Sequence, residues 1–181
     1  HPEKSKLYLG ERHMDIMGPC RSGAVLVENF IPSDGRLLGI LAVPKPDGQT
    51  LAVRGSDILD LTDTMENGFV YFDLPEGAYR LFILFTTRTG GGRDHYMNLI
   101  DSSSVKVLLD EVYEKHYARY SKYFGNVIAG FFSDEPELGN VKGYPFDNML
   151  GQKDIRLPWS DELERKLTET WKEEFLTNLP A

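Results

Sequence analysis

An acidic pair follows a short apolar run in the second half of the chain. The run over 127–132 ends just before Asp134, Glu135 and Pro136. Carboxyl groups at the end of a strand can face a ligand while the backbone stays rigid, and a carboxylic acid there can transfer a proton. Pro136 biases Glu135 toward extended backbone. The pattern therefore indicates acid and base chemistry, and the alternative is the polar start of a solvated surface loop.

A glycine-rich stretch is the second candidate for chemistry. Three consecutive glycines at 90–92 precede Arg93, Asp94 and His95. Glycine-rich loops cradle phosphates, but this stretch has neither GxGxxG nor Gly-Lys-Ser/Thr, and the next expected helix begins several residues later. We interpret it as a flexible strand-end loop that presents these three polar side chains to a cleft, and the alternative is a solvated hairpin tip.

Aromatic residues come after the acidic pair, at Tyr144, Phe146 and Trp159. Amphipathic rings combine flat apolar faces with polar edges, and sugar rings present the same combination. Exposed rings would favour a carbohydrate site, whereas buried rings would belong to the core. The sequence leaves both interpretations open.

Candidate metal ligands occur only in pairs. His13 lies near Asp15, and Asp94 is next to His95, but neither pair has helical i, i+4 spacing or a third ligand nearby in sequence. Cys20 is the single cysteine, which excludes an internal disulfide and a cysteine zinc site. We expect no metal site and no cofactor.

Charge and hydropathy exclude two classes of partner. The 181 residues include 20 basic and 28 acidic side chains, which gives a net charge of -8. A surface of that sign repels phosphates, so nucleic acid is not expected as a partner. The longest apolar stretches have five or six residues, far below the roughly 20 that cross a bilayer, so no membrane partner is expected. The lone cysteine slightly favours the cytoplasm over secretion.

The secondary structure that must position these residues is predicted to change near residue 100, from β strands before it to helices after it. Over 36–88, short apolar segments alternate with turn signals, which are Pro-Asp-Gly at 46–48, Asn-Gly at 67–68 and Pro-Glu-Gly at 75–77. This alternation predicts an antiparallel β unit. The preceding residues, 1–35, are expected to be a loop-rich segment without an assigned element.

The remaining residues, 89–181, predict helices near 102–124 and 161–176 with a buried strand near 127–132. Apolar residues at i, i+3, i+4 and i+7 give the first helix one stripe that is expected to be buried. Asp101, or a serine just after it, and Ser160 are the expected N-caps. A helix that leads into a buried strand is half of a parallel β/α unit.

The order and spacing of several motifs resemble bacterial glycoside hydrolases of the α-L-rhamnosidase-like, TIM-barrel type. The motifs are Asn-Leu-Ile-Asp at 98–101 with the helix after it, Tyr-Phe-Gly at 123–125, residues 130–137 with Asp-Glu-Pro-Glu, and Leu-Pro-Trp at 157–159. With the β-rich stretch before them, the resemblance covers roughly residues 68–165. It implies that the motif ends a barrel strand and that Glu135 is the general acid beside Asp134. Because adjacent residues of a strand point to opposite faces, we expect the second carboxylate to come from another strand end.

The expected fold is therefore α/β, an antiparallel β-rich N-terminal half followed by β/α units of an incomplete TIM-type barrel. A full barrel takes about 250 residues. We therefore expect a fragment of a larger glycosidase that is inactive alone and whose exposed barrel faces associate with one another. The hypothesis places these residues at the carbohydrate: Asp134, Arg93, Asp94, His95, Asn98, Tyr144 and Trp159. The alternative is a non-catalytic carbohydrate-binding or accessory module.

Overall fold

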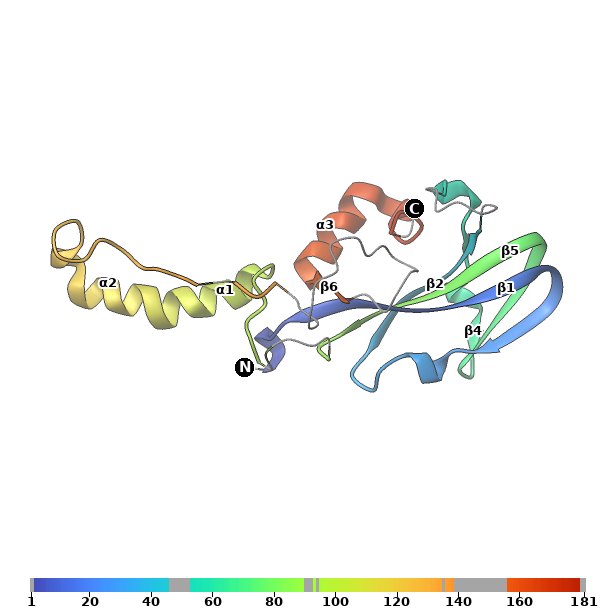
Figure 1. Cartoon of the computed structure of the whole chain (residues 1–181), viewed down its shortest axis with the longest axis horizontal. Coiled ribbons are helices and arrows are strands. Elements are labelled where there is room, and N and C mark those ends of the chain that lie inside the picture. Colours follow the sequence, from blue (N-terminus) through green and yellow to red (C-terminus); the bar gives the residue numbers. More distant parts are fainter. Residues whose placement is uncertain are drawn as a thin grey trace.

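Two long antiparallel strands form the centre of the molecule (Figure 1). The computed structural model describes residues 2–45, 53–89, 93, 95–134, 136–138 and 156–179. β1 (Leu7–Leu26) pairs with β5 (Phe69–Thr87) along almost their full length, and the register shifts near Cys20. All the other described strands are added to this pair.

The sheet has the order β3-β2-β5-β1-β6, and every neighbouring pair in it is antiparallel. The added strands are β2 (Arg36–Pro44), β3 (Leu59–Asp60) and β6 (Arg156–Trp159), and β4 (Met65–Glu66) pairs with the start of β5. The predicted Asn-Gly turn at 67–68 is confirmed, because it joins β4 to β5 with positive φ angles of 50° and 82°.

Both faces of the sheet are apolar, as the alternation of side chains along β5 shows. Leu81, Ile83 and Phe85 belong to one buried cluster, whereas Phe82 and Leu84 belong to another. The second cluster includes the apolar side of α3 (Asp161–Trp171), which lies over that face (Figure 1). The core is thus formed by the sheet with a helix on one side and turns on the other.

The predicted helix near 102–124 forms, but it projects away from the sheet (Figure 1). It comprises α1 (Ser102–Leu108), a π-helical turn (Leu109–Tyr113), α2 (Glu114–Tyr120) and a 3-10 turn (Ser121–Tyr123). The chain then returns beside the helix (Figure 1). We call residues 102–134 the arm. Among the described residues, no helix is long and apolar enough to span a membrane.

Both predicted N-caps are confirmed. The Asp101 carboxylate accepts a hydrogen bond from the backbone N–H of Ser104 at 3.1 Å. The Ser160 hydroxyl accepts one from the N–H of Leu163 at 3.0 Å and donates one to the carbonyl of Ile100 at 2.9 Å. Ser160 therefore connects α3 to the loop that leads into the arm.

The predicted α/β fold with β/α barrel units is wrong. The described strands form an open antiparallel sheet, and no β/α unit occurs in the part of the chain that the structure describes. The expected buried strand near 127–132 does not form, because this segment lies on the arm, away from the sheet (Figure 1). Most of its side chains are exposed instead, with Val127 79% and Phe132 89% accessible. The apolar stripe of the preceding helix is also partly exposed.

Two local expectations in the first half also differ from the structure. The segment 1–35 contains β1 and the start of the sheet, rather than loops alone. Residues 75–77 form no chain reversal, because β5 continues through them opposite the irregular part of β1. Gly18 allows this pairing, since a Cβ there would lie 1.7 Å from the carbonyl oxygen of Pro75. The predicted Pro-Asp-Gly turn at 46–48 lies outside the described residues.

Candidate functional site

The start of β1 lies against the loop that follows β5. Ser5 and Met97 form an antiparallel bridge, and the backbone N–H of Lys6 donates to the carbonyl of Tyr96 at 2.9 Å. The N–H of Asn98 donates to the carbonyl of Lys4 at 3.0 Å. These contacts place Lys6 beside the loop that carries Arg93 and His95.

Four residues from three separate parts of the chain converge there, and we call Lys6, Arg93, Tyr96 and Glu137 the Glu137 cluster. The ammonium group of Lys6 donates a hydrogen bond to the Glu137 carboxylate. The backbone N–H of Arg93 donates to the same carboxylate at 2.7 Å, and the Arg93 Nε lies 3.6 Å from Glu137 Oε2. The N–H of Glu137 in turn donates to the Tyr96 hydroxyl at 3.4 Å.

Lys6 is a buried cation, with 5% of the residue accessible. Its ammonium nitrogen lies 5.8 Å from the centre of the Tyr8 ring and 5.5 Å from that of Tyr96, so two aromatic faces stabilise its charge. Burial works to lower the pKa of Lys6, but its interactions with Glu137 and Tyr8 outweigh burial and raise that pKa. Lys6 therefore stays charged at neutral pH.

Glu137 is held as a carboxylate. The hydrogen bond from Lys6, followed by the one from the Arg93 backbone, lowers the pKa of Glu137. Its side chain is 13% accessible. An ionised carboxylate with these donors is an acceptor, so Glu137 fixes the chain after the acidic motif and cannot serve as a proton donor at neutral pH.

The structure thus brings Glu137, the residue after the Asp-Glu-Pro motif, into contact with Arg93 of the glycine-rich stretch. The Arg93 side chain is 81% accessible and His95 is exposed with a positive φ of 62°. Asp134 is exposed at the end of the arm and takes part in an interaction. Asp94, Glu135 and Tyr144 lie outside the described residues.

Asn98 and Trp159 lie in the interior instead of at an open surface. The Asn98 side-chain amide donates to the carbonyl of Trp159 at 2.8 Å and its oxygen accepts from the N–H of Ile100 at 3.3 Å. Trp159 is 3% accessible, and its indole N–H donates to Glu164 at 3.0 Å. Its ring packs near Phe175, with 6.5 Å between the ring centres. These two residues join β6 to the loop before the arm.

A buried carboxylate on β1 was not singled out in the sequence. Glu11 is fully buried, and Nδ1 of His13 lies 3.0 Å from its Oε2. Asp15, two residues further along the same face, binds Arg80 at 2.8 Å and Lys45 at 2.6 Å. The i, i+2 spacing of Glu11, His13 and Asp15 is the signal that could have revealed this polar row on a strand. Among the described residues, no three potential ligands form a metal site.

Comparison with known proteins gives no match. No family model, no curated protein and no solved structure matches this chain. The site must therefore be interpreted from its own geometry.

Proposed function

We propose that this chain is part of a glycoside hydrolase in which Glu135 donates a proton to the leaving glycosidic oxygen. The observation that supports this is the anchoring of Glu137 by Lys6 and by the Arg93 backbone. Only Pro136 separates Glu135 from Glu137, so the Cα atoms of the two glutamates are at most about 7 Å apart. The anchor therefore keeps the acidic motif close to the loop that carries Arg93 and His95.

The charges of the Glu137 cluster fit a division of roles between carboxyl groups. Glycoside hydrolysis needs one protonated carboxylic acid and one ionised carboxylate. The environment of Glu137 lowers its pKa and excludes it as the acid, and the family resemblance implies Glu135 in that role. The second reacting carboxylate would lie about 5 Å from the acid for retention or about 6.5–9.5 Å for inversion.

The polar groups near the Asp-Glu-Pro motif are of types that form hydrogen bonds with a sugar. The Arg93 guanidinium is largely exposed, and a guanidinium donates in a fixed fork that matches the paired oxygens of vicinal hydroxyls or of a sugar carboxylate. His95, two residues after Arg93, and Asp134, directly before Glu135, are also exposed. We propose that these groups bind the sugar, with Asp94 as a further contact. Trp159 acts through its packing, because its ring is buried.

The non-catalytic alternative relied on an aromatic platform. The burial of Trp159 removes the one ring of that platform that lies among the described residues. No observation favours the alternative over an acid site, so the hydrolase is the function that we propose.

The test compares aryl glycosides whose leaving groups differ in pKa. A panel of common sugars is first screened for binding to this chain by amide shifts of Arg93 and His95 in NMR spectra, and glycosides of the sugars that bind are then tested for hydrolysis by the intact enzyme. Glu135→Gln in the intact enzyme should lower kcat roughly 10²- to 10⁴-fold on substrates with poor leaving groups. The loss should shrink for 2,4-dinitrophenyl glycosides, which depart without protonation.

Glu76→Gln, a change at an exposed glutamate within β5, is the matched control and should leave hydrolysis unchanged. An equal effect of Glu135→Gln on good and poor leaving groups would contradict the role of Glu135 as acid. Absence of both binding and hydrolysis across the panel would contradict the carbohydrate site itself.

A further inference from the structure

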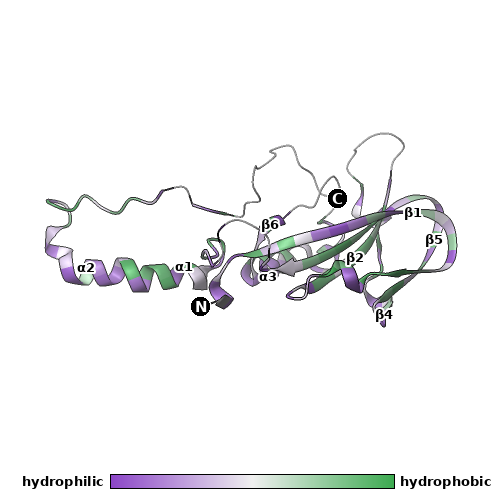
Figure 2. Cartoon of the chain, turned by 60° about the horizontal axis from the view of Figure 1, so that its bottom comes forward, coloured by the Kyte–Doolittle hydropathy of each residue, from purple (hydrophilic) through white to green (hydrophobic). Residues whose placement is uncertain are grey.

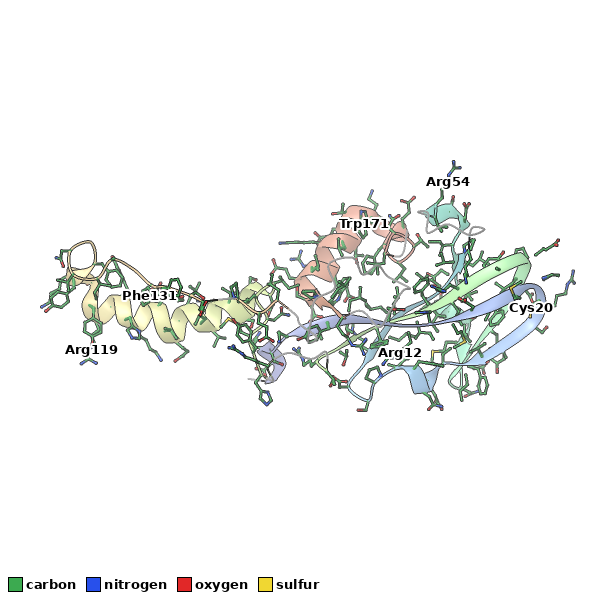
Figure 3. All side chains as sticks on the ribbon, viewed as in Figure 1. Arg12, Cys20, Arg54, Arg119, Phe131 and Trp171 are labelled. Carbon is green, nitrogen blue, oxygen red and sulfur yellow. The ribbon has the colours of Figure 1, made fainter. Side chains whose placement is uncertain are left out.

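The arm contains a segment that pairs with no described strand. Residues 129–133 run as an open chain beside the helix (Figure 1) and, among the described residues, have no bridge to another strand. Phe131 points toward the helix, where its ring centre lies 4.5 Å from that of Tyr113 and 6.1 Å from that of His116 (Figure 3). Because side chains alternate along an extended chain, Phe132 points away from the helix.

The outward side of this segment is unusually apolar for a free surface. Phe132 is 89% accessible, and Figure 2 shows further apolar residues along the arm. Other exposed apolar side chains of the arm are Leu109, Val112, Tyr117, Tyr123 and Val127. An aromatic side chain offers about 150–250 Å². The arm therefore exposes several hundred Å² of apolar surface, the same order as the roughly 800 Å² per partner that a standard interface covers.

The backbone of residues 129–133 indicates that the partner is another strand. Unpaired N–H and C=O groups along an extended chain are a template for another strand. The composition of the segment, with adjacent aromatic residues between small ones, is also the one that predicted a buried strand from the sequence. The side-chain pattern and the backbone of this segment therefore both favour pairing with another strand. No other described part of the chain pairs with it.

We propose that residues 129–133 pair with the same segment of a second copy of this chain, antiparallel and about a two-fold axis through Phe131. In this register Phe132 of each copy lies directly opposite Gly130 of the other. Gly130 has open space where a Cβ would be, with nothing within 4 Å. An aromatic ring that covers a cross-strand glycine is a known stabilising pair in sheets. Because the contact is reciprocal, the segment is complementary to itself.

Charge favours the arm as the place where two copies meet. Residues 102–134 contain four basic and four acidic side chains, so the arm is neutral and the whole net charge of -8 lies in the rest of the chain. Two copies that approach through their arms keep their acidic parts apart. This proposal does not depend on the function proposed above.

The oligomeric state of the chain in solution tests whether this surface forms a dimer interface. Sedimentation equilibrium of the whole chain over a wide concentration range should show a monomer–dimer equilibrium. Phe132→Asp should raise the dimer Kd at least about 100-fold, because both copies lose a buried ring and gain a charge. The matched control is Met17→Asp, at a side chain of the sheet that is 69% accessible, and it should leave the Kd unchanged. Unchanged circular dichroism of Phe132→Asp would show that the variant folds.

Cross-linking tests the register. In a Cys20→Ser background, Ala129→Cys and Ser133→Cys chains are mixed and oxidised. Directly opposite residues of an antiparallel pair have Cα atoms about 4.5–5.5 Å apart, which suits a disulfide. Disulfides should therefore form between unlike chains and exceed those between like chains.

Three results would overturn the proposal. They are a monomer at every concentration, a dimer that Phe132→Asp leaves intact, and disulfides that form mainly between like chains.

Discussion

The strongest test of the Glu137 cluster is the substitution Lys6→Met. Methionine keeps the length and the apolar stem of lysine but removes the charge that Glu137 binds. The change leaves the Glu137 carboxylate 13% accessible and without its first donor. It also removes the cation from between the Tyr8 and Tyr96 rings.

The expected loss of stability depends on which donors the Glu137 carboxylate keeps after the substitution. Removing one partner of a buried ion pair costs about 3–5 kcal/mol when the other charge is left without compensation. Here the carboxylate keeps the hydrogen bond from the Arg93 backbone and the nearby Arg93 guanidinium. We therefore expect a lower cost, about 2–3 kcal/mol, which for a chain of this size lowers the melting temperature by roughly 5–10 °C.

Thermal and urea unfolding measure this cost. Lys106→Met, which breaks an exposed i, i+4 pair with Asp110 on the arm, is the matched control and should leave the melting temperature unchanged. Adding Glu137→Gln to Lys6→Met should recover part of the loss, because the amide needs no cation. If Lys6→Met and Lys106→Met behave alike, Lys6 does not hold a buried carboxylate and the account of the cluster is wrong.

Three other predictions concern pH and local structure. The Arg80 hydrogen bond, with that of Lys45, lowers the pKa of Asp15 from 3.8 to about 2, so its contribution to stability holds above 3.8 and is lost as the pH falls through about 2. NMR titration should show this midpoint, and Arg80→Met should raise it; an unchanged midpoint would refute the assignment. Gly18→Ala should lower the melting temperature far more than Gly55→Ala, because only the first Cβ overlaps a backbone oxygen; equal melting temperatures would count against it. Ser160→Ala should cost about 1 kcal/mol in urea unfolding through loss of the α3 cap, and no change would mean that the cap adds nothing.

Local signals in the sequence predicted local structure correctly. Asp101 and Ser160 were recognised as N-caps because a cap depends on the side chain and the next three residues. The Asn-Gly turn at 67–68 needs only two residues that accept positive φ. In contrast, the burial of the segment 127–132 depends on distant neighbours, and a strand-like composition cannot say whether a partner strand is present. The error in the fold class came from this step and from the barrel that the family resemblance implied.

The strand β1 was missed for a reason that bears on the site itself. A half-buried strand is recognised by apolar residues at alternate positions, but the start of the sheet buries Lys6 and Glu11 at places where that pattern requires apolar side chains. Charged groups are buried only where specific partners hold them, as Glu137 holds Lys6 and as Glu11 contacts His13. Sequences depart from local patterning mainly at functional or strained sites. Lys6, one of the two charged residues that concealed the strand, is therefore also the residue that holds Glu137, at the end of the acidic motif, against the sheet.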